Sequence, residues 1–367
     1  MINILYIVST LRKTGPIIVL DNIIKYLDKS KFIPIILTLS KEPKDSLKEY
    51  FINDLHTRVE TLNLSRLQGF FLAKNRIKKI VKDNNINFIH THGLRADIIV
   101  SHLSTPFIST IHNYPHYDYP LRHGKIKGGL MAKKHIEFIQ NNPRNSIACA
   151  KAISYDFKQD GFELEYIQNG VDTDKFHPIN EQEKENLKEN LNIDKSKRIF
   201  ISTGALISRK DTKTLIKGFM NFNKNKNNLL LIAGDGFEKQ ELEDISDENI
   251  IFLGNISNID QYLQISDCFV SASLAEGLPN SVLEAMSCGL PTLLSDIPSH
   301  RELYEDEFGE FFQIKNIKEL TEKLYSVKSN FKIISNLSTR LVEKNFSAKV
   351  MSLKYQKIYL EKLKYVK

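Results

Sequence analysis

Short apolar, β-branched segments alternate with longer segments of helical periodicity along the whole chain. Six strand-like segments come first, at residues 2–8, 33–39, 58–62, 88–90, 107–111 and 146–149. Between them, segments such as 17–27 and 66–82 carry apolar residues at three- and four-residue spacing, as amphipathic helices do. The alternation then restarts, with strand-like segments at 199–203, 229–233, 250–253, 268–272 and 292–295. This order predicts an α/β protein with parallel, doubly wound sheets.

The two series of strands predict two Rossmann-like domains. A chain of 367 residues is long enough to bury two separate hydrophobic cores. We expect the first domain at 1–170, the second at 171–345, and a C-terminal helix at 346–367 that packs back toward the first domain. Ligands of such folds bind at the carboxyl ends of the strands, so we expect the two domains to face an interdomain cleft that holds the site.

Composition excludes several classes of protein. With 41% hydrophobic and 26% charged residues, the chain is neither disordered nor fibrous. Its three cysteines are too scattered for a disulfide framework or a zinc site, which fits a reducing cytoplasm. The first ten residues lack the basic start and cleavage site of a signal peptide, so we interpret them as a strand. We therefore expect a cytoplasmic protein that meets a membrane only peripherally, on its inner face.

Charge is distributed unevenly along the chain. Residues 1–170 carry nine more basic than acidic side chains, whereas residues 171–367 carry two more acidic than basic ones. A basic first domain indicates an anionic partner, which composition alone does not identify as nucleic acid, anionic lipid or a phosphorylated substrate. The chain has no nucleic-acid recognition motif, so we do not expect nucleic acid as a partner.

Two basic segments of the first domain account for this excess. In segment 66–82 the apolar residues form one stripe, consisting of Leu67, Phe70, Phe71, Ile77, Ile80 and Val81. The basic residues lie mostly elsewhere on the same helix, at Arg66, Lys74, Lys78, Lys79 and Lys82. Segment 122–134 adds six more basic or histidine residues. These segments are either helices with a solvated outer face or a surface attracted to an anionic membrane, at about 1 kcal/mol per basic residue.

Segment 271–296, SASLAEGLPNSVLEAMSCGLPTLLSD, is the most informative part of the sequence. A strand ends near Ala272, a loop holds Glu276, and a helix begins near Asn280, which is a good N-cap residue. The N–H groups and the dipole of such a helix start favour a phosphate group. Glu284 lies one turn into the helix, so the two carboxylates can contact a sugar nucleotide at different points. The expected donor contacts here are Leu278, Asn280, Ser281, Val282 and Glu284.

This segment resembles the signature of the GT-B glycosyltransferases, specifically of the retaining family 4, also called glycosyl transferases group 1. The signature has two glutamates separated by seven residues, which Glu276 and Glu284 match, and the resemblance extends over nearly the whole chain. The surrounding matches are Gly277, Ala285, Met286, Gly289 and Pro291. The resemblance implies that Glu276 binds hydroxyls of the transferred sugar and that Glu284 holds the ribose.

An upstream segment, TGALISRKDTKTLIKGF, resembles the family's clamp for the donor diphosphate, which consists of an arginine and a lysine. Lys210 stands at the lysine position, but Ala205 stands where the family has arginine. Arg209 is adjacent to Lys210. Neighbouring residues at a helix start point in different directions, so whether Arg209 replaces the missing arginine stays open at this stage.

In the first domain the resemblance concerns the ends of the strands. Gly15 follows the first strand where the family has two glycines near the donor phosphate, although Thr14 replaces the first of them. His112 matches a strand-terminal histidine that faces the reacting sugar carbon. The implied catalytic residues are His112, Glu276 and Lys210. We assign Arg122 to the acceptor side. His92, near another strand end, lies either on the acceptor side or in a supporting position behind the site, and a purely structural role for it stays open.

The resemblance implies a retaining glycosyltransferase that moves a hexose or N-acetylhexosamine from a nucleotide diphosphate sugar, with UDP as the expected nucleotide. The implied acceptor is a bacterial surface glycan on a lipid carrier, in capsule, O-antigen or exopolysaccharide synthesis. No metal or other cofactor is expected, because the lysine and the helix dipole take the metal's role. The alternatives are a catalytically silent GT-B partner subunit that binds glycan, which the Ala205 departure supports, and a nucleotide-sugar 2-epimerase, which lacks this glutamate pattern.

Overall fold

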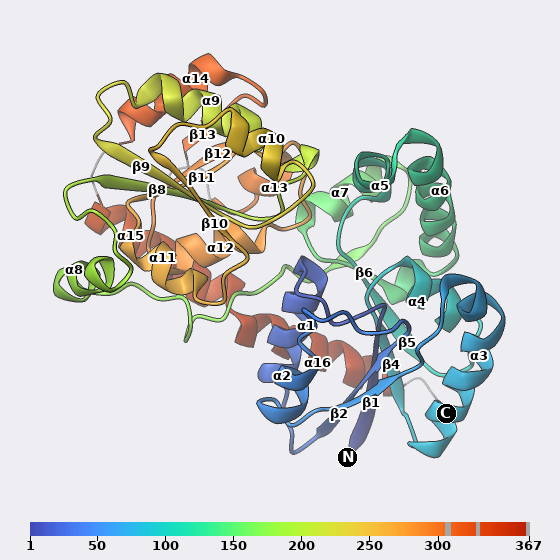
Figure 1. The fold of residues 1–367 in the computed structure, drawn as a ribbon. Coiled ribbons are helices and arrows are strands. Elements are labelled where there is room, and N and C mark those ends of the chain that lie inside the picture. The colour runs from blue at the N-terminus through green and yellow to red at the C-terminus, as the bar shows by residue number, and fades with distance from the viewer. Residues whose placement is uncertain (305–309, 328–330, 365–367) are drawn as a thin grey trace. The chain divides into compact units, whose positions relative to one another are not determined.

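The computed structural model describes residues 1–304, 310–327 and 331–364 (Figure 1). The chain divides into two compact units, of which the first contains Met1–Gly170 and Ala348–Lys367 and the second contains Val171–Ser347. Each unit is built on a parallel sheet with helices packed against it, and each has its own hydrophobic core. The prediction of two doubly wound, Rossmann-like domains is therefore confirmed.

In the described residues, the first unit contains a seven-stranded parallel sheet in the order β3-β2-β1-β4-β5-β6-β7. Its strands are β1 (Ile2–Val8), β2 (Phe32–Thr38), β3 (Arg58–Thr61), β4 (Phe88–Thr91), β5 (Phe107–Ile111), β6 (Ser146–Ala148) and β7 (Glu165–Tyr166). Its helices are α1 (Gly15–Lys25), α2 (Lys48–Asn53), α3 (Arg66–Asp83), α4 (Leu94–Val100), α5 (Pro115–His123), α6 (Lys125–Asn141), the short η1 (Pro143–Asn145), α7 (Lys151–Gln159) and α16 (Ala348–Lys364). The C-terminal helix α16 packs against α1, where Ser352 Oγ donates to the Ile23 carbonyl at 2.8 Å. Tyr355 and Tyr359 of α16 are fully buried in this unit's core.

The second unit contains, in its described part, a six-stranded parallel sheet in the order β10-β9-β8-β11-β12-β13. Its strands are β8 (Arg198–Thr203), β9 (Asn228–Ala233), β10 (Ile250–Gly254), β11 (Cys268–Ser271), β12 (Thr292–Ser295) and β13 (Glu310–Phe312). Its helices are α8 (Glu181–Asn190), the turn η2 (Ser208–Lys210), α9 (Thr212–Phe222), α10 (Lys239–Asp244), α11 (Ile259–Ile265), α12 (Asn280–Ser287), α13 (Pro298–Arg301), α14 (Ile317–Ser326), α15 (Phe331–Leu341) and the π-helical η3 (Val342–Phe346). Because β8 and β11 are adjacent, the loops that follow them meet at one edge of the sheet.

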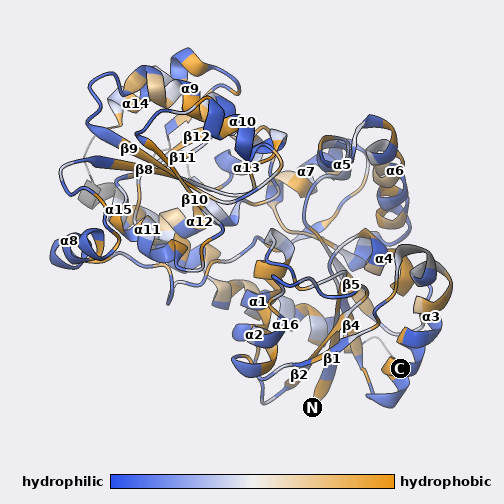
Figure 2. Cartoon of the chain, viewed as in Figure 1, coloured by the Kyte–Doolittle hydropathy of each residue, from blue (hydrophilic) through white to orange (hydrophobic). Residues whose placement is uncertain are grey.

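The sequence patterns locate the long strands to within two residues and miss the short strands at the sheet edges. β7 has two residues, both exposed, and β13 has three, so neither contains a long apolar run. Hydrophobic residues concentrate in the strands and on the inner faces of the helices (Figure 2). The predicted helix start near Asn280 is confirmed, whereas the assignment of Asn280 as its N-cap residue is wrong. Pro279, not Asn280, occupies the cap position of α12, and Asn280 is already helical.

The expected apolar stripe of α3 is only partly buried. Ile77 is fully buried, as predicted, whereas Phe71 is 72% exposed and does not pack on the sheet. The side chains of Arg66, Leu67 and Phe70 lie outside the described residues. The predicted apolar stripe therefore includes residues that do not face the sheet. A single helical face cannot turn every apolar residue of this segment toward it.

Candidate active site

The loop between β11 and α12 places Glu276 at the carboxyl end of the second unit's sheet. Ser273 Oγ donates a hydrogen bond to Glu276 Oε1 at 2.8 Å. The backbone N–H of Leu274 donates to the Arg209 carbonyl at 2.8 Å, which ties this loop to the turn after β8. The Glu276 side chain is only 7% exposed, so its position is fixed by the surrounding protein.

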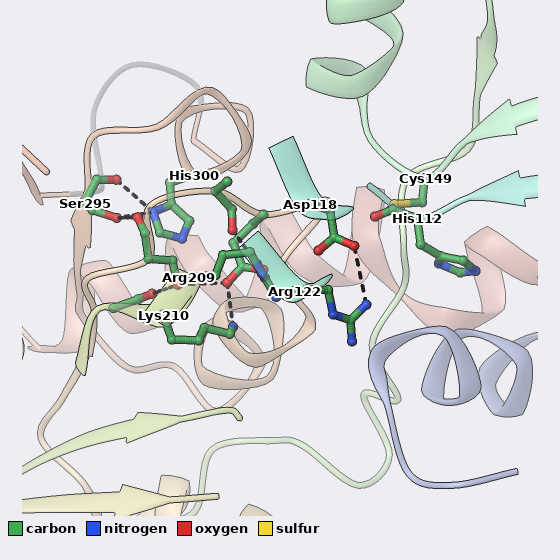
Figure 3. A network of polar contacts seen from close by, with 12 residues as sticks. His112, Asp118, Arg122, Cys149, Arg209, Lys210, Ser295 and His300 are labelled. Carbon is green, nitrogen blue, oxygen red and sulfur yellow. Dashed lines mark hydrogen bonds and ion pairs between the residues drawn. The ribbon is translucent and has the colours of Figure 1, made fainter. Parts of the chain in front are cut away.

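Arg209 and Lys210 of η2 both bind the Glu276 carboxylate (Figure 3). Arg209 Nη1 lies 2.6 Å from Oε2, and Lys210 Nζ lies 2.5 Å from Oε1. Arg209 Nη1 also donates to the Ala275 carbonyl. Although the two cations are sequence neighbours, the tight η2 turn and the length of their side chains let both reach the same carboxylate. Arg209 therefore supplies a second cation in this site, while Ala205 contributes only a small side chain to its wall.

The electrostatics of this cluster leave it with an excess of positive charge. Burial alone would raise the pKa of Glu276, but the charges of Arg209 and Lys210 outweigh burial and hold that pKa well below its usual range. Glu276 is therefore ionised at neutral pH, and two cations share one carboxylate. An additional anion placed beside Lys210 and Arg209 would complete the neutralisation.

Close backbone contacts shape the small pocket beside Lys210. Gly234 has φ of +140°, and a Cβ there would lie 1.8 Å from the Gly204 carbonyl oxygen. A Cβ at Gly204 itself would meet Lys210 Cε at 3.1 Å. These two positions require glycine, because the loops after β8 and β9 touch each other and the lysine side chain. The pocket is lined by Ser202, Thr203, Gly204, Ala205, Leu206, Lys210, Thr212, Ile232, Ala233, Ser271 and Ser273.

The expected donor contacts near the start of α12 differ in how deeply their side chains are buried. The side chains of Leu278 and Val282 are buried in the protein, at 4% and 0% exposure, so only their backbone atoms can contact a ligand. Asn280, Ser281 and Glu284 are half-buried. The helix presents its N-terminal backbone on the side of the loop that carries Glu276, in keeping with a site for a negatively charged group.

His300 of α13 is a residue of this region that the sequence analysis missed (Figure 3). It is fully buried, and its Nδ1 lies 2.8 Å from the Ser295 carbonyl oxygen. Its Nε2 has no hydrogen-bond partner among the described residues. Burial lowers the pKa of His300 to about 4, and the charge of Glu276 acts on it in the opposite direction. His300 could have been noticed from the sequence, because it comes shortly after a strand, as His112 does.

In the first unit, His112 follows β5 and contacts His92, which follows β4. Nε2 of His112 lies 2.9 Å from Nδ1 of His92, and the rings stack with centroids 5.1 Å apart. Burial lowers the pKa of His112 to about 4, so its ring is neutral at pH 7. His92 is 5% exposed and is bound to His112. His92 therefore lies behind His112 in this unit, and its assignment to the acceptor side stays a prediction.

The remaining predicted residues of the first unit lie on two helices. Gly15 is the first residue of α1, and a Cβ there would meet no atom within 4 Å, so there is open space beside this backbone. Arg122 lies in the last turn of α5, where its Nη1 contacts Asp118 Oδ2 at 3.4 Å. The Arg122 side chain is 46% exposed and remains accessible to a ligand.

Comparisons with known proteins bear on this arrangement. The model of Glycosyltransferase Family 4 matches residues 15–175, and the model of Glycosyl transferases group 1 matches residues 183–345. The chain belongs to the group 1 glycosyltransferases. The O-antigen biosynthesis glycosyltransferase WclY of Escherichia coli is 25% identical to this glycosyltransferase, over 97% of each chain. The Escherichia coli UDP-Gal:alpha-D-GlcNAc-diphosphoundecaprenol alpha-1,3-galactosyltransferase is 27% identical over 73% of this chain and 71% of its own.

A solved structure supports the fold of this glycosyltransferase. Anabaena Alr3699/HepE, in complex with UDP and glucose, superimposes with a TM-score of 0.80 at 16% identity, over 98% of this chain and 100% of its own. The glycosyltransferase therefore has the GT-B fold, and it is a transferase of the glycosyl-transferring class.

Proposed function

We propose that this glycosyltransferase transfers a hexose or N-acetylhexosamine from a UDP-linked donor, with retention, to a lipid-linked acceptor in the synthesis of a bacterial surface glycan. The observation that carries the proposal is the cluster of Arg209, Lys210 and Glu276 beside the start of α12. The names of two relatives support the proposed pathway, donor nucleotide and acceptor. One is an O-antigen glycosyltransferase, and the other is named for a UDP-linked sugar and a diphosphoundecaprenol-linked acceptor.

The charges of the cluster match the reaction. As the bond between the anomeric carbon and the diphosphate oxygen breaks, negative charge develops on the leaving phosphate, and fixed cations stabilise it. Lys210, Arg209 and the N-terminus of α12 supply that charge, so we propose that the diphosphate is held without a divalent metal ion. Glu276 pairs with both cations. When the diphosphate binds to these cations, the Glu276 carboxylate accepts hydrogen bonds from hydroxyls of the transferred sugar.

The retention that we propose needs no nucleophile from this cluster. Both oxygens of Glu276 are occupied by cations or by Ser273 in the described structure, so this carboxylate is not poised to attack the sugar. We propose that the acceptor hydroxyl attacks from the face that the diphosphate leaves. Its oxygen forms the new bond to the anomeric carbon, and its proton passes to the leaving phosphate oxygen. His112, neutral at pH 7, acts there as a hydrogen-bonding group and not as a proton donor.

The experiment is incubation with a panel of labelled nucleotide sugars, followed by measurement of slow donor hydrolysis. Hydrolysis of a UDP-sugar supports the proposal. Binding without any turnover would favour the catalytically silent partner subunit, and a new epimeric sugar nucleotide would favour the 2-epimerase. The second cation supplied by Arg209 removes the main support for the silent subunit, which was the loss of the family arginine at Ala205.

Glu284→Ala should weaken UDP binding about ten- to a hundredfold, because a carboxylate bound to the ribose contributes roughly 1.5–3 kcal/mol. Turnover at saturating donor should change less, since the ribose contact exists both before and during the reaction. Calorimetry with UDP measures the loss. Glu284→Gln keeps an acceptor oxygen and should lose less than Glu284→Ala. An unchanged UDP affinity in Glu284→Ala would remove the ribose assignment.

Peripheral membrane binding is the second part of the proposal, and the surface of the first unit supports it. No helix within the described ranges has the length and apolar character needed to cross a bilayer. On α5 and α6, apolar side chains are exposed next to basic ones. The exposed apolar residues are Tyr117, Leu121, Ile126 and Leu130, at 56%, 45%, 84% and 62%. On α3, Phe71 is exposed close to the basic residues Lys74 and Lys78. Such mixed surfaces bind anionic lipid.

Substituting Lys74, Lys78, Lys79 and Lys82 with glutamine should reduce binding to vesicles containing acidic lipid by up to about a thousandfold, because each of the four lysines near a charged surface contributes up to about 1 kcal/mol. Added salt should release the unaltered protein, since exposed charges are screened over about 8 Å at physiological ionic strength. The matched control replaces Lys213, Lys226, Lys239 and Lys318 of the second unit, each of which lies near a glutamate. Vesicle binding that survives both salt and the α3 substitutions would contradict membrane attraction by α3.

A further inference from the structure

A buried contact between two histidines stands out in the first unit. Nδ1 of His92 and Nε2 of His112 are 2.9 Å apart, a hydrogen-bond distance. Burial lowers the pKa of both rings, which are therefore neutral at pH 7. Each neutral imidazole carries one hydrogen. The contact therefore contains a single hydrogen, which belongs to one of the two rings.

We propose that His92 is a positioning residue for His112. It occupies Nε2 of His112, so Nδ1 is the ring nitrogen that His112 offers to a bound donor. The inference rests on the proposed function, in which His112 contacts the donor. It assigns to His92 a role in that site without contact between His92 and any substrate.

The second nitrogen of His92 decides which ring donates. Nε2 of His92 is buried and has no hydrogen-bond partner among the described residues. If His112 donated, His92 would carry its own hydrogen on Nε2, as a buried N–H without an acceptor. If His92 donates from Nδ1, only a lone pair is left without a partner. Because buried N–H groups without acceptors are the rarer defect, we assign the hydrogen to His92 Nδ1. His112 then carries its hydrogen on Nδ1 and can donate it to an oxygen of the donor.

The surroundings hold His92 in this orientation. Its backbone N–H donates to the Ile7 carbonyl at 3.1 Å, and its ring lies against His90 with centroids 4.4 Å apart. His90 is itself fixed at both nitrogens, because Nδ1 lies 2.8 Å from the Tyr359 hydroxyl and Nε2 lies 2.8 Å from Thr110 Oγ1. Tyr359 belongs to α16, so the C-terminal helix helps to fix the His90 ring.

His90 also provides a matched control. It lies two residues before His92, is equally buried, and makes two hydrogen bonds, none of them to His112. His90→Phe keeps a ring against His92 and removes only the contacts to Tyr359 and Thr110. His92→Phe keeps a ring but removes the hydrogen bond to His112. His92→Asn places an amide N–H near the position of Nδ1 and can restore the donation.

The test is nitrogen NMR of the full chain labelled at histidine, with the His112 signals assigned by their loss in His112→Gln. In the unaltered protein we expect the hydrogen of His112 on Nδ1 and none on Nε2. His92→Phe should shift His112 to a mixture of both tautomers, whereas His90→Phe should leave its signals in place. In parallel, His92→Phe should lower kcat for donor hydrolysis roughly ten- to a hundredfold, as loss of an orienting partner does. His92→Asn should recover most of that loss, and melting temperatures verify folding of each variant.

Several outcomes would overturn the inference. A hydrogen on Nε2 of His112 in the unaltered protein would reverse the assigned donor. Equal effects of His92→Phe and His90→Phe on the His112 signals and on kcat would show that His92 only fills space in the core and does not position His112. The NMR result does not depend on turnover. If no nucleotide sugar is hydrolysed, the proposed function fails, while the His112 tautomer still decides whether His92 positions that ring.

Discussion

Arg209→Ala is expected to lower kcat/KM for donor hydrolysis roughly a hundred- to a thousandfold, the usual effect of removing one fixed group that stabilises developing charge. In the structure Arg209 Nη1 lies 2.6 Å from Glu276 Oε2, and the side chain is only 13% exposed. It therefore forms one half of the positive cluster beside α12. Without it, Lys210 alone would oppose the charge that develops on the diphosphate. Steady-state kinetics with the best donor from the panel measures the effect.

Two further variants make this result specific to the position of Arg209. Lys213→Ala removes an exposed cation three residues beyond Lys210, one that pairs with Glu241 at 2.6 Å, and should leave kcat/KM nearly unchanged. Ala205→Arg restores the residue found in the family and should be neutral or harmful, because Arg209 already supplies the second cation. A gain of activity in Ala205→Arg together with an active Arg209→Ala would show that Arg209 does not replace the family arginine. Indifference to both changes and to Lys210→Ala would show that the diphosphate binds elsewhere.

The sequence was sufficient to predict the architecture because long buried strands have a strong signal. Apart from Asn3 and Asn228, β1 and β9 consist of apolar residues, as is typical of parallel strands buried on both faces. Glu276 lies in the predicted loop and Glu284 in the predicted helix, because both placements depend on local sequence. Short edge strands such as β7 escaped, because two exposed residues have no pattern to detect.

Contacts between segments that are distant in the chain could not be predicted from the sequence patterns. Arg209 and Glu276 are separated by 67 residues, and their meeting depends on β8 and β11 being neighbours in the sheet. A rule about adjacent residues at a helix start could not foresee that a tight turn brings both cations to one carboxylate. The same holds for His92, whose partner His112 follows the next strand in the sheet. His300, by contrast, had a local signal, as a histidine that follows a strand.

Glu276→Gln is expected to reduce turnover at least a hundredfold without weakening the binding of UDP. The loss of turnover follows from the proposed contact with the transferred sugar, a contact that should strengthen in the transition state. UDP binding should be retained or tightened, because the Glu276 carboxylate pairs with the two cations that the diphosphate would bind and offsets part of their charge. Removing it leaves Arg209 and Lys210 close together without a counter-ion. The folded state should lose about 3 kcal/mol, as when one member of a buried ion pair is removed.

Calorimetry and thermal melting together separate these effects. UDP should raise the melting temperature of Glu276→Gln by at least as much as that of the unaltered protein, since a bound diphosphate replaces the missing negative charge. Glu241→Gln, which breaks the exposed pair with Lys213, is the matched control and should change neither turnover nor the response to UDP. If the affinity for UDP fell in parallel with turnover, Glu276 would contact the nucleotide itself. The division of labour between Glu276 at the sugar and Glu284 at the ribose would then be wrong.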